Sequence, residues 1–507
     1  MNKWFIVLCA CIFGMHTYVC AEFNTATGLV VHRQISDDGS QVLLRLPYPA
    51  YTGYHWEPAN EPLNLRDADE TIKGLVPSYL SNDGQTIVGY YIRSDGNPEA
   101  FRWRTSDGLL GLGDLPSGRF ESDAFGCSVD GSVVFGEGRV ATGSRPMRWT
   151  ETAGMIDLFP DHAFYIQPFA VDCSEDGQIV VGSAQVYEET VSVIWNNGNI
   201  HVLGLMPDAM GTNIRENFPI ACSPDGTRLI GYGYHPDFGI FHGANSIWSW
   251  SNDDGFEDFL APIGGDLAKF SANAYVSEDL SCVVVGFVDW NDGGILRWRE
   301  GAGIDLLEYP GKSSTAWQSS ADGNIVIGSN IGLDNVSRAV IWDAFGKMHI
   351  LDDLLASTGI DTGGRELLSA SAISPDGRSI AGQLPLEDNK SIAYHVTLSG
   401  LWSFDEPIAE RWRQSPWYGN YYMGPGTVIY HENHAWQDYF TGEFFNIYYY
   451  DHATQNWFWT SSDYYPFFYI IGSMNRWVYY RIGSNPREFV DVETGAVFNE
   501  DDLIPPP

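Results

Sequence analysis

The chain has 507 residues, of which 44 % are hydrophobic, so it can form a large core and is not globally disordered. Its net charge of −37 argues against nucleic-acid binding, because a surface this acidic repels the phosphate backbone. The same charge is typical of a soluble, self-repelling surface, and it also fits a bound cation or a basic partner.

Residues 1–21 are predicted to be a secretory signal peptide. Lys3 precedes the apolar run "WFIVLCACIFGM", and the small residues of "VCA" predict cleavage after Ala21. The alternative is a lipoprotein acylated on Cys20, although residues 17–19 fit that signal poorly. No later segment is long and apolar enough to cross a membrane. We therefore expect export by the Sec route to the periplasm, the cell surface or the medium.

A polar turn, Ser-x-Asp-Gly, then recurs between about residues 35 and 382. Its serines are Ser36, Ser81, Ser128, Ser174, Ser223, Ser277, Ser320 and Ser374, with successive spacings of 45, 47, 46, 49, 54, 43 and 54 residues. The turn residues expected to have structural roles are Ser81, Asp83, Gly84, Ser128, Asp130, Gly131, Ser174, Asp176, Gly177, Ser223, Asp225, Gly226, Ser320, Asp322, Gly323, Ser374, Asp376 and Gly377. Glycine accepts positive φ in a tight hairpin, and serine and aspartate side chains bond turn amides.

In seven of the eight units the turn is followed by a tryptophan-containing strand, such as "AFRWR" or "AVIWD", and in most units a short apolar strand such as "GMIDLF" comes next. Units of about 40–50 residues with four short strands are typical of β-propeller blades. The sequence thus predicts an all-β fold: a propeller over residues 22–402 with eight blades, or alternatively seven. The number of blades is ambiguous for two reasons. The last unit, "AYHVTLSGLW", is degenerate, and in the seven-bladed alternative the first unit only completes the ring.

Two further residue types have structural roles in the predicted blades. The tryptophans are expected to fill the space between neighbouring blades. In seven units a glycine follows the turn and suits a strand end where another backbone comes close; these glycines are Gly89, Gly136, Gly182, Gly231, Gly286, Gly328 and Gly382. In the sixth unit Leu280 replaces the turn glycine and one extra residue follows, so an altered turn is expected there.

Four cysteines remain after signal cleavage. Cys127, Cys173 and Cys222 each directly precede a motif serine, where other units have mostly apolar residues, and Cys282 lies elsewhere in its unit. An even number in an exported protein permits disulfides. Three equivalent positions in three blades do not pair neatly, however, so buried free thiols are predicted instead of disulfides or a metal site.

The repeat resembles the HAF repeat family of exported bacterial proteins. The resemblance is carried by the serine–aspartate–glycine turns, by "AFRW" at 100–103 and by "GMIDLF" at 154–159, and it covers about residues 28–400. The "SPDG" units are also similar to the repeats of TolB-type propellers. The resemblance implies an extracellular β-propeller and supplies no catalytic residues.

The strands of a blade run from the axis to the rim, so the Ser-x-Asp-Gly turns and the short connections before the outermost strands lie on one face. The longer connections lie on the opposite face, where binding residues usually reside. The candidate ligand residues on this loop-rich face are His162, Tyr165, Arg215, His235, His242 and Trp290. Ordinary loop packing is the alternative for each of them.

Residues 403–507 are expected to form a separate, small β-meander domain, rich in tyrosine and tryptophan and without Ser-x-Asp-Gly turns. "NWFWTSSDYYPFFY" and "RWVYYRIG" resemble aromatic C-terminal modules of exported proteins in aquatic bacteria. The aromatic residues predict either a stacked core or a platform for carbohydrate. His431 and His434 of "HENH" are not expected to bind metal, because positions i and i+3 of a strand point to opposite sides.

The predicted function is a non-catalytic, exported binding module, without cofactor or metal, whose partner is a carbohydrate or a cell-surface protein. The chain is expected to be a monomer. The alternative is a glycan-active enzyme of the sialidase or lyase type, because paired carboxylates are available in an acidic chain. The sequence leaves enzymatic activity open, and it lacks the cysteine pair and tryptophan signature of quinone-dependent dehydrogenases and the usual hydrolase motifs.

Overall fold

The computed structural model describes residues 23–46, 52–66, 72–159, 165–187, 189–196, 198–206, 216–234, 246–258, 269–270, 274–288, 293–357, 362, 364–385, 391–398, 406–409, 412–415, 418–424, 428–441, 446–461, 464–471 and 474–504. Two compact units emerge, one spanning Phe23–Val396 and the other containing Thr397–Pro507. The predicted signal peptide lies outside the described residues.

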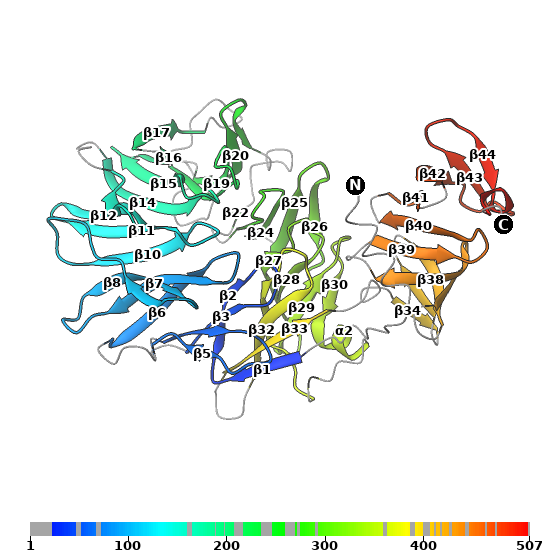
Figure 1. Ribbon diagram of the computed structural model, residues 1–507, viewed down its shortest axis with the longest axis horizontal. Helices are drawn as coiled ribbons and strands as arrows, with labels where there is room; N and C mark the ends of the chain where they lie inside the picture. The colour runs from blue at the N-terminus through cyan, green and yellow to red at the C-terminus, as the bar shows by residue number, and fades with distance from the viewer. Residues whose placement is uncertain are drawn as a thin grey trace. The chain divides into compact units, whose positions relative to one another are not determined.

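The first unit is a β-propeller whose antiparallel blades succeed one another around a ring (Figure 1). Blade 1 consists of β2 (Val30–Ile35), β3 (Val42–Arg45), β4 (Gly53–Trp56) and β5 (Leu63–Asn64), and blade 2 of β6 (Gly74–Leu80), β7 (Thr86–Ile92), β8 (Pro98–Arg104) and β9 (Gly108–Gly111). Blade 3 consists of β10 (Ser122–Cys127), β11 (Val133–Val140), β12 (Gly143–Thr150) and β13 (Gly154–Asp157), and blade 4 of β14 (Tyr165–Cys173), β15 (Ile179–Val186), β16 (Glu189–Asn196) and β17 (Asn199–Gly204). Blade 5 consists of β18 (Glu216–Cys222), β19 (Arg228–Tyr234), β20 (Ser246–Ser251) and β21 (Gly255–Asp258), and blade 6 of β22 (Lys269–Phe270), β23 (Tyr275–Val276), β24 (Cys282–Val288), β25 (Gly293–Arg299) and β26 (Gly303–Leu307). Blade 7 consists of β27 (Ser313–Ser319), β28 (Val326–Ile331), β29 (Ser337–Trp342) and β30 (Met348–Ile350), and blade 8 of β31 (Ser369–Ile373), β32 (Ser379–Pro385), β33 (Ser391–Thr397) and β1 (Phe23–Thr27).

The ring has eight blades, and the seven-bladed alternative is wrong. The first repeat forms a complete blade, β2 to β5. The N-terminal strand β1 instead completes the eighth blade by pairing with β33, in a register that places Phe23 opposite Val396. The degenerate last unit is therefore a full blade whose outermost strand comes from the other end of the propeller sequence, which ties the ring closed.

The Ser-x-Asp-Gly turn joins the innermost strand of each blade to the next strand and has the same hydrogen bonds in all eight blades. The serine Oγ donates to the aspartate carboxylate at 2.5–2.8 Å. It also accepts the amide of the residue five positions later, as Ser223 accepts Arg228 N at 3.0 Å. The predicted role of the motif side chains in holding the hairpin closed is confirmed.

The expectation of an altered turn in the sixth blade is wrong. Leu280 has φ 61° and donates its amide to Ser277 O at 2.9 Å, as the turn glycines of the other blades do. Its side chain is fully buried in a cluster with Ile230, Ile247 and Val283 between the fifth and sixth blades. Burial of a leucine side chain contributes about 1.5–3 kcal/mol, which offsets the cost of positive φ in a non-glycine residue.

A β-bulge interrupts the innermost strand three residues before the motif serine, and it explains the recurring glycine. In six blades the residue opposite this glycine immediately precedes the bulge, as in Ala170↔Gly182 before the bulged Val171. A Cβ on Gly182 would lie 1.9 Å from Phe169 O, and the equivalent approach recurs at Gly89, Gly136, Gly231, Gly328 and Gly382. The predicted close backbone approach is confirmed there, within the strand rather than at its end. In the sixth blade Val285 occupies the equivalent position and the predicted glycine, Gly286, lies one residue later.

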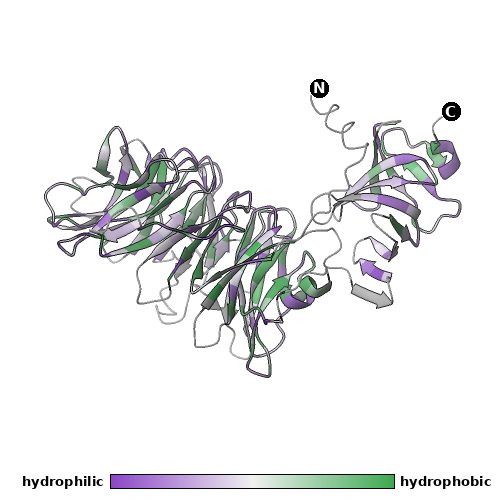
Figure 2. Ribbon diagram, turned by 60° about the horizontal axis from the view of Figure 1, so that its bottom comes forward, coloured by the Kyte–Doolittle hydropathy of each residue, from purple (hydrophilic) through white to green (hydrophobic). Residues whose placement is uncertain are grey.

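Apolar side chains between neighbouring blades form the core of the propeller, and hydrophobic segments recur along its strands in Figure 2. Trp103 lies with Leu43 of the first blade, and Trp149 lies with Val88 and Ala100 of the second. The tryptophans therefore fill the inter-blade space, as predicted. In the eighth blade Val396 occupies this position, and Tyr394, two residues earlier, is also fully buried.

The second unit is an eleven-stranded antiparallel meander, in which consecutive strands are neighbours, so the predicted β-meander is confirmed. Its elements are β34 (Glu406–Ala409), β35 (Trp412–Ser415), β36 (Gly419–Met423), β37 (Val428–His431), β38 (Ala435–Thr441), β39 (Asn446–Asp451), β40 (Asn456–Ser461), β41 (Phe467–Ile471), β42 (Arg476–Tyr480), β43 (Glu488–Asp491), β44 (Val497–Asn499) and the 3₁₀ helix η3 (Glu500–Leu503). Aromatic side chains, among them Tyr449, Phe458 and Phe468, form its core.

The "HENH" segment is a turn and not a strand, so the argument from opposite strand faces is wrong. β37 ends at His431 and β38 begins at Ala435. His431 accepts the amide of His434 on Nδ1 at 3.2 Å, and both imidazoles are buried in the same core, with ring centroids 4.7 Å apart. Burial lowers the pKa of His431 to about 4, so its imidazole is neutral and serves the turn.

The helix α2 (Leu351–Ser357) lies in the connection between the seventh and eighth blades. Within the described ranges, no helix has the length and apolar character that crossing a bilayer requires.

Candidate functional site

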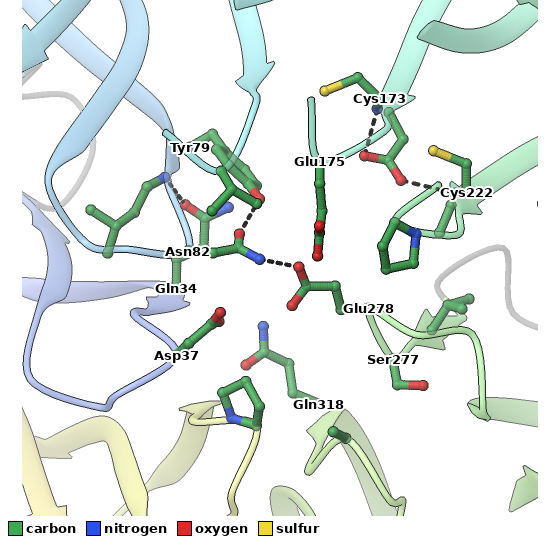
Figure 3. A pocket seen from close by; sticks show the side chains of 18 of the residues that line it. Gln34, Asp37, Tyr79, Asn82, Cys173, Glu175, Cys222, Ser277, Glu278 and Gln318 are labelled. Carbon is green, nitrogen blue, oxygen red and sulfur yellow. Dashed lines mark hydrogen bonds between the residues drawn. The ribbon is translucent and has the colours of Figure 1, made fainter. Parts of the chain in front are cut away.

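The Ser-x-Asp-Gly turns converge at one end of the propeller axis and line a central pocket. The variable residue of each motif faces this pocket, and the eight together are called the turn ring: Asp37, Asn82, Val129, Glu175, Pro224, Glu278, Ala321 and Pro375. The pocket has a volume of about 270 Å³. Figure 3 shows the carboxylates of Asp37, Glu175 and Glu278 and the amide of Gln318 directed toward one centre.

Hydrogen bonds connect the turn ring around and across the axis. The amide of Asp37 donates to Asn82 O at 2.9 Å, and the same backbone contact joins Glu175 to Pro224. Across the ring, the side-chain amide of Asn82 in the second blade donates to the Glu278 carboxylate in the sixth. The turn end of the axis is thus held by contacts between blades that are far apart in sequence.

Two carboxyl groups of the turn ring, Asp37 and Glu278, have pKa values that are shifted toward the neutral form. Burial and the charges of Asp38 and Glu175 raise the pKa of Asp37 to about 6. Burial, with the charges of Asp37 and Glu175, raises the pKa of Glu278 to about 7. Negative groups from three blades therefore share a volume in which not all of them are ionised at neutral pH.

Beneath the turn ring, side chains two residues before the motif serine connect adjacent blades. Gln34 accepts the amide of Leu80 at 2.6 Å, and Asp172 accepts the amide of Cys222 at 2.9 Å. Gln318 makes the same contact with Ile373 N at 3.1 Å. Burial raises the pKa of Asp172 to about 6, although the two amides that it accepts oppose this shift. These side chains have a structural role at the pocket wall.

The cysteines of this wall are free thiols, as predicted. Cys127, Cys173 and Cys222 line the pocket, and none forms a disulfide. Burial raises the pKa of each of them above the usual thiol value, and the Asp172 charge contributes at Cys173 and Cys222. Cys282 lies on β24 against Ser319, outside this wall. In the part of the chain that the structure describes, no three His, Cys, Asp or Glu side chains are grouped as metal ligands.

A second cavity lies between the fourth and fifth blades, toward the loop-rich end of their inner strands. Its volume is about 680 Å³. The lining residues come from the three inner strands of blade 4 and the two inner strands of blade 5: Phe169, Val171, Ser183, Gln185, Thr190, Glu216, Phe218, Pro219, Ile220 and Tyr232. Among the described residues, Thr190 and Glu216 form the one parallel pair that joins these two blades into a single sheet. The following sections call this space the blade 4–5 cavity.

The structure places few of the predicted ligand residues. His162, Arg215, His235, His242 and Trp290 lie outside the described residues. Tyr165 is the first residue of β14, the strand that contributes Phe169 and Val171 to the blade 4–5 cavity, and its side chain also lies outside the described part. The assignment of these six residues to a ligand site therefore stays a prediction.

Of the residues that line the turn-ring pocket, the sequence pointed to the three cysteines and to two motif serines, Ser174 and Ser277, but to no residue of the turn ring and to none that lines the blade 4–5 cavity. The turn ring occupies the variable position of a motif that was interpreted only as a structural turn. Its signal was available, because a variable position repeated in eight blades must surround the axis. The blade 4–5 cavity had no comparable signal, since Phe218 and Tyr232 are neighbours only through the pairing of β18 with β19.

Comparisons with known proteins give no family for this chain: no family model and no curated protein matches it. Among solved structures it is similar to an oligogalacturonate lyase from Vibrio parahaemolyticus, at 12 % identity and a TM-score of 0.43, over 75 % of this chain and 98 % of that one. It is also similar to the β-propeller domain of the Trilobed protease from Pyrococcus furiosus, at 13 % identity and 0.39, over 65 % and 98 %. A putative TolB from Agrobacterium tumefaciens matches at 13 % identity and 0.30, over 75 % and 91 %. Because every one of these scores is below 0.5, they carry no argument about function, and the propeller assignment rests on the sheet topology of the chain itself.

Proposed function

We propose that the chain is an exported, non-catalytic binding module that receives its ligand at the loop-rich end of the propeller, in the blade 4–5 cavity. The observation that carries this proposal is the cavity itself. Its volume of about 680 Å³ is within the usual range of ligand pockets, and apolar and polar side chains line it together. The inner strands of the propeller provide a rigid frame for them.

The experiment compares the secreted chain with a Phe218→Ala variant against a panel of soluble saccharides, amines, peptides and metal ions. Ligand binding to the folded chain stabilises it by RT ln(1 + [L]/Kd), so the melting temperature rises with the logarithm of the ligand concentration once that concentration exceeds Kd. We expect at least one compound class to stabilise the wild type and to lose at least about tenfold in affinity with Phe218→Ala. A panel without effect, or binding that Phe218→Ala leaves unchanged, contradicts the proposal.

Export is part of the same proposal and has its own test. The support is the sequence of residues 1–21, with a positive residue before an apolar run and small residues at the cleavage site. Fractionation of cells and N-terminal sequencing of the exported chain should give Glu22 as the first residue. Retention in the cytoplasm with Met1 intact contradicts it.

A glycan-active enzyme is the second candidate, and the carboxylates of the turn-ring pocket favour it. Carboxyl groups with separated pKa values are what acid–base chemistry on a glycosidic bond requires. Glu278, whose pKa is raised to about 7, sits beside Asp37 and Glu175 in this arrangement. Time-resolved mass spectrometry of oligosaccharides incubated with the protein tests it: cleavage that Glu278→Gln abolishes supports the enzyme and overturns the non-catalytic proposal, whereas intact substrates contradict the enzyme.

A further inference from the structure

We propose that the outward face of the C-terminal meander binds an uncharged polysaccharide chain, which lies across the strands on a row of tryptophan and tyrosine rings. The site belongs to the second unit and is independent of the blade 4–5 cavity. Its support is the position, the solvent exposure and the charge of the side chains on that face.

The side chains of the meander alternate between the two faces of one sheet. On β39 and β40, Tyr449 and Phe458 point inward and belong to the buried core. Their sequence neighbours Tyr448 and Trp457 lie on the opposite face, because successive residues of a strand point to opposite sides. The inward side chains pack into one cluster, so the sheet curls around them (Figure 1) and its outward face is convex. A convex face has no walls to enclose a small molecule, but an extended polymer can lie along it.

Aromatic side chains oppose one another across consecutive strands on this outward face. One ladder crosses β35 to β38 and contains Trp412, Tyr422, Tyr430 and Trp436. Another crosses β39 to β42 and contains Tyr448, Trp459, Tyr469 and Trp477. Neighbouring strands lie about 4.7–4.9 Å apart, which is close to the length of one sugar unit in an extended β-linked chain. A polysaccharide laid across the strands therefore meets an aromatic ring at each strand.

Solvent reaches this face after all contacts within the protein are made. Six aromatic side chains, called the exposed aromatic face, are 37–49 % exposed: Trp436, Tyr448, Trp457, Tyr464, Phe467 and Tyr479. Neighbouring rings contact them at an angle, since the planes of Trp457 and Tyr450 are 58° apart and those of Trp436 and Tyr430 are 64° apart. Such contacts fix the orientation of a ring and leave part of its flat surface in solvent.

The outward face carries almost no charge, in a chain whose net charge is −37. At the outward positions of β35–β42 that the structure describes, Asp438 is the one charged residue, and its carboxylate lies 3.0 Å from His452 Nε2. A polyanion or an anionic lipid surface requires basic side chains, and a basic partner requires more carboxylates. The exposed aromatic face therefore complements an uncharged partner.

The residue types favour a saccharide over an apolar protein or a lipid. A tyrosine or tryptophan side chain combines a flat apolar ring with a polar O–H or N–H group. The C–H face of a neutral sugar packs on such a ring, and the sugar hydroxyls bond its polar edge. Among the described outward positions of β35–β42, Val428 and Ile471 are the only aliphatic residues, and neither methionine nor arginine, which protein interfaces favour, occurs there.

The test is depletion binding of the full secreted chain on insoluble neutral polysaccharides, namely cellulose, chitin, mannan and curdlan, with phosphatidylcholine vesicles in parallel. We expect one polysaccharide to retain the protein. The double variant Trp457→Ala with Tyr464→Ala should weaken this binding by at least about tenfold, and Trp436→Ala, on another strand, by about threefold or more. The matched control is Phe345→Ala, which removes an exposed aromatic ring of the seventh blade and should leave the affinity unchanged.

Four results would overturn the inference. No polysaccharide retains the chain, or retention is the same in the double variant and in Trp436→Ala, which would place the sugar site elsewhere. Vesicle binding that the double variant abolishes would assign the face to a lipid surface. Self-association of the wild type in sedimentation velocity, abolished by the same variant, would assign it to a second copy of the chain. Circular dichroism verifies that each variant is folded, and Trp457→Phe, which keeps a ring, should retain most of the affinity.

Discussion

The side-chain amide of Asn82 donates a hydrogen bond to the carboxylate of Glu278 across the propeller axis, joining the second blade to the sixth. These residues are 196 positions apart in the sequence and occupy the same motif position in their blades. The contact lies amid other carboxylates, so its energy and the protonation of Glu278 depend on each other.

The first prediction concerns stability against pH. The pKa values of Asp37 and Glu278 are raised, from 3.8 to about 6 and from 4.5 to about 7. A carboxyl group whose folded pKa is raised contributes stability that is fully present below its unfolded pKa and is lost as the pH rises through its folded pKa. The melting temperature should therefore fall between about pH 5 and pH 7.5, and Glu278→Gln should flatten this decline. A melting temperature that rises over this interval in the wild type contradicts the assignment.

The second prediction concerns the turns. Ser223 donates to Asp225 at 2.6 Å and accepts the Arg228 amide at 3.0 Å. The hydrogen bond from Ser223, together with those from Thr227, lowers the pKa of Asp225 to about 2. Ser223→Ala should destabilise the fold by about 1–2 kcal/mol, because it leaves the amide unpaired. It should also return the pKa of Asp225 toward 3.8, which carboxyl-detected NMR titration can follow. An unchanged pKa would mean that the hydroxyl contributes nothing to the turn.

The third prediction concerns the bulge. A Cβ at Gly182 would lie 1.9 Å from Phe169 O, an overlap that only a shift of the backbone relieves. Gly182→Ala should destabilise the propeller by about 1–3 kcal/mol in urea unfolding. Gln178→Ala, an exposed residue of the same hairpin, is the control and should change the stability by less than about 0.5 kcal/mol. Equal effects of the two variants would refute the close packing of glycine against the bulge.

The fourth prediction concerns thiol reactivity. Burial raises the pKa of Cys127 and Cys222, so the thiolate that reacts with iodoacetamide is scarce in the folded protein. Mass spectrometry should find both unmodified after labelling at mildly alkaline pH and fully modified after labelling in guanidinium. Rapid labelling of either cysteine in the native state would show that the pocket wall opens.

The fifth prediction concerns the aromatic meander. Arg487 binds Asp451 with two contacts, at 2.6 and 3.1 Å, and Glu500 at 2.7 Å, and the Asp451 side chain is fully buried. Arg487→Ala leaves a buried carboxylate unpaired and should cost about 3–5 kcal/mol. Arg481→Ala, whose partner Glu488 is on the surface, should cost at most about 1 kcal/mol. Thermal unfolding of the whole chain, followed by the fluorescence of the meander tryptophans, measures both.

The sequence by itself determined the local parts of this protein. A serine, an aspartate and a glycine suffice to close each turn, because their hydrogen bonds join residues within five positions of one another. The eightfold repetition of that turn, with a tryptophan strand after it, was enough to predict a propeller and the free thiols. Where the local pattern was broken, at Leu280, the prediction failed, because burial against Ile230 in the neighbouring blade decided the turn.

Only the tertiary structure decided what the repeats place together. Ring closure by β1 fixed the number of blades, since pairing with β33 depends on the whole circumference and not on any one unit. The same closure brings Asn82 to Glu278, and the packing of the fifth blade on the fourth sets Phe218 and Tyr232 beside Phe169 around one cavity. Contacts of this kind depend on where whole blades lie in space. A periodic sequence shows that blades recur along the chain, but it does not specify their positions relative to one another.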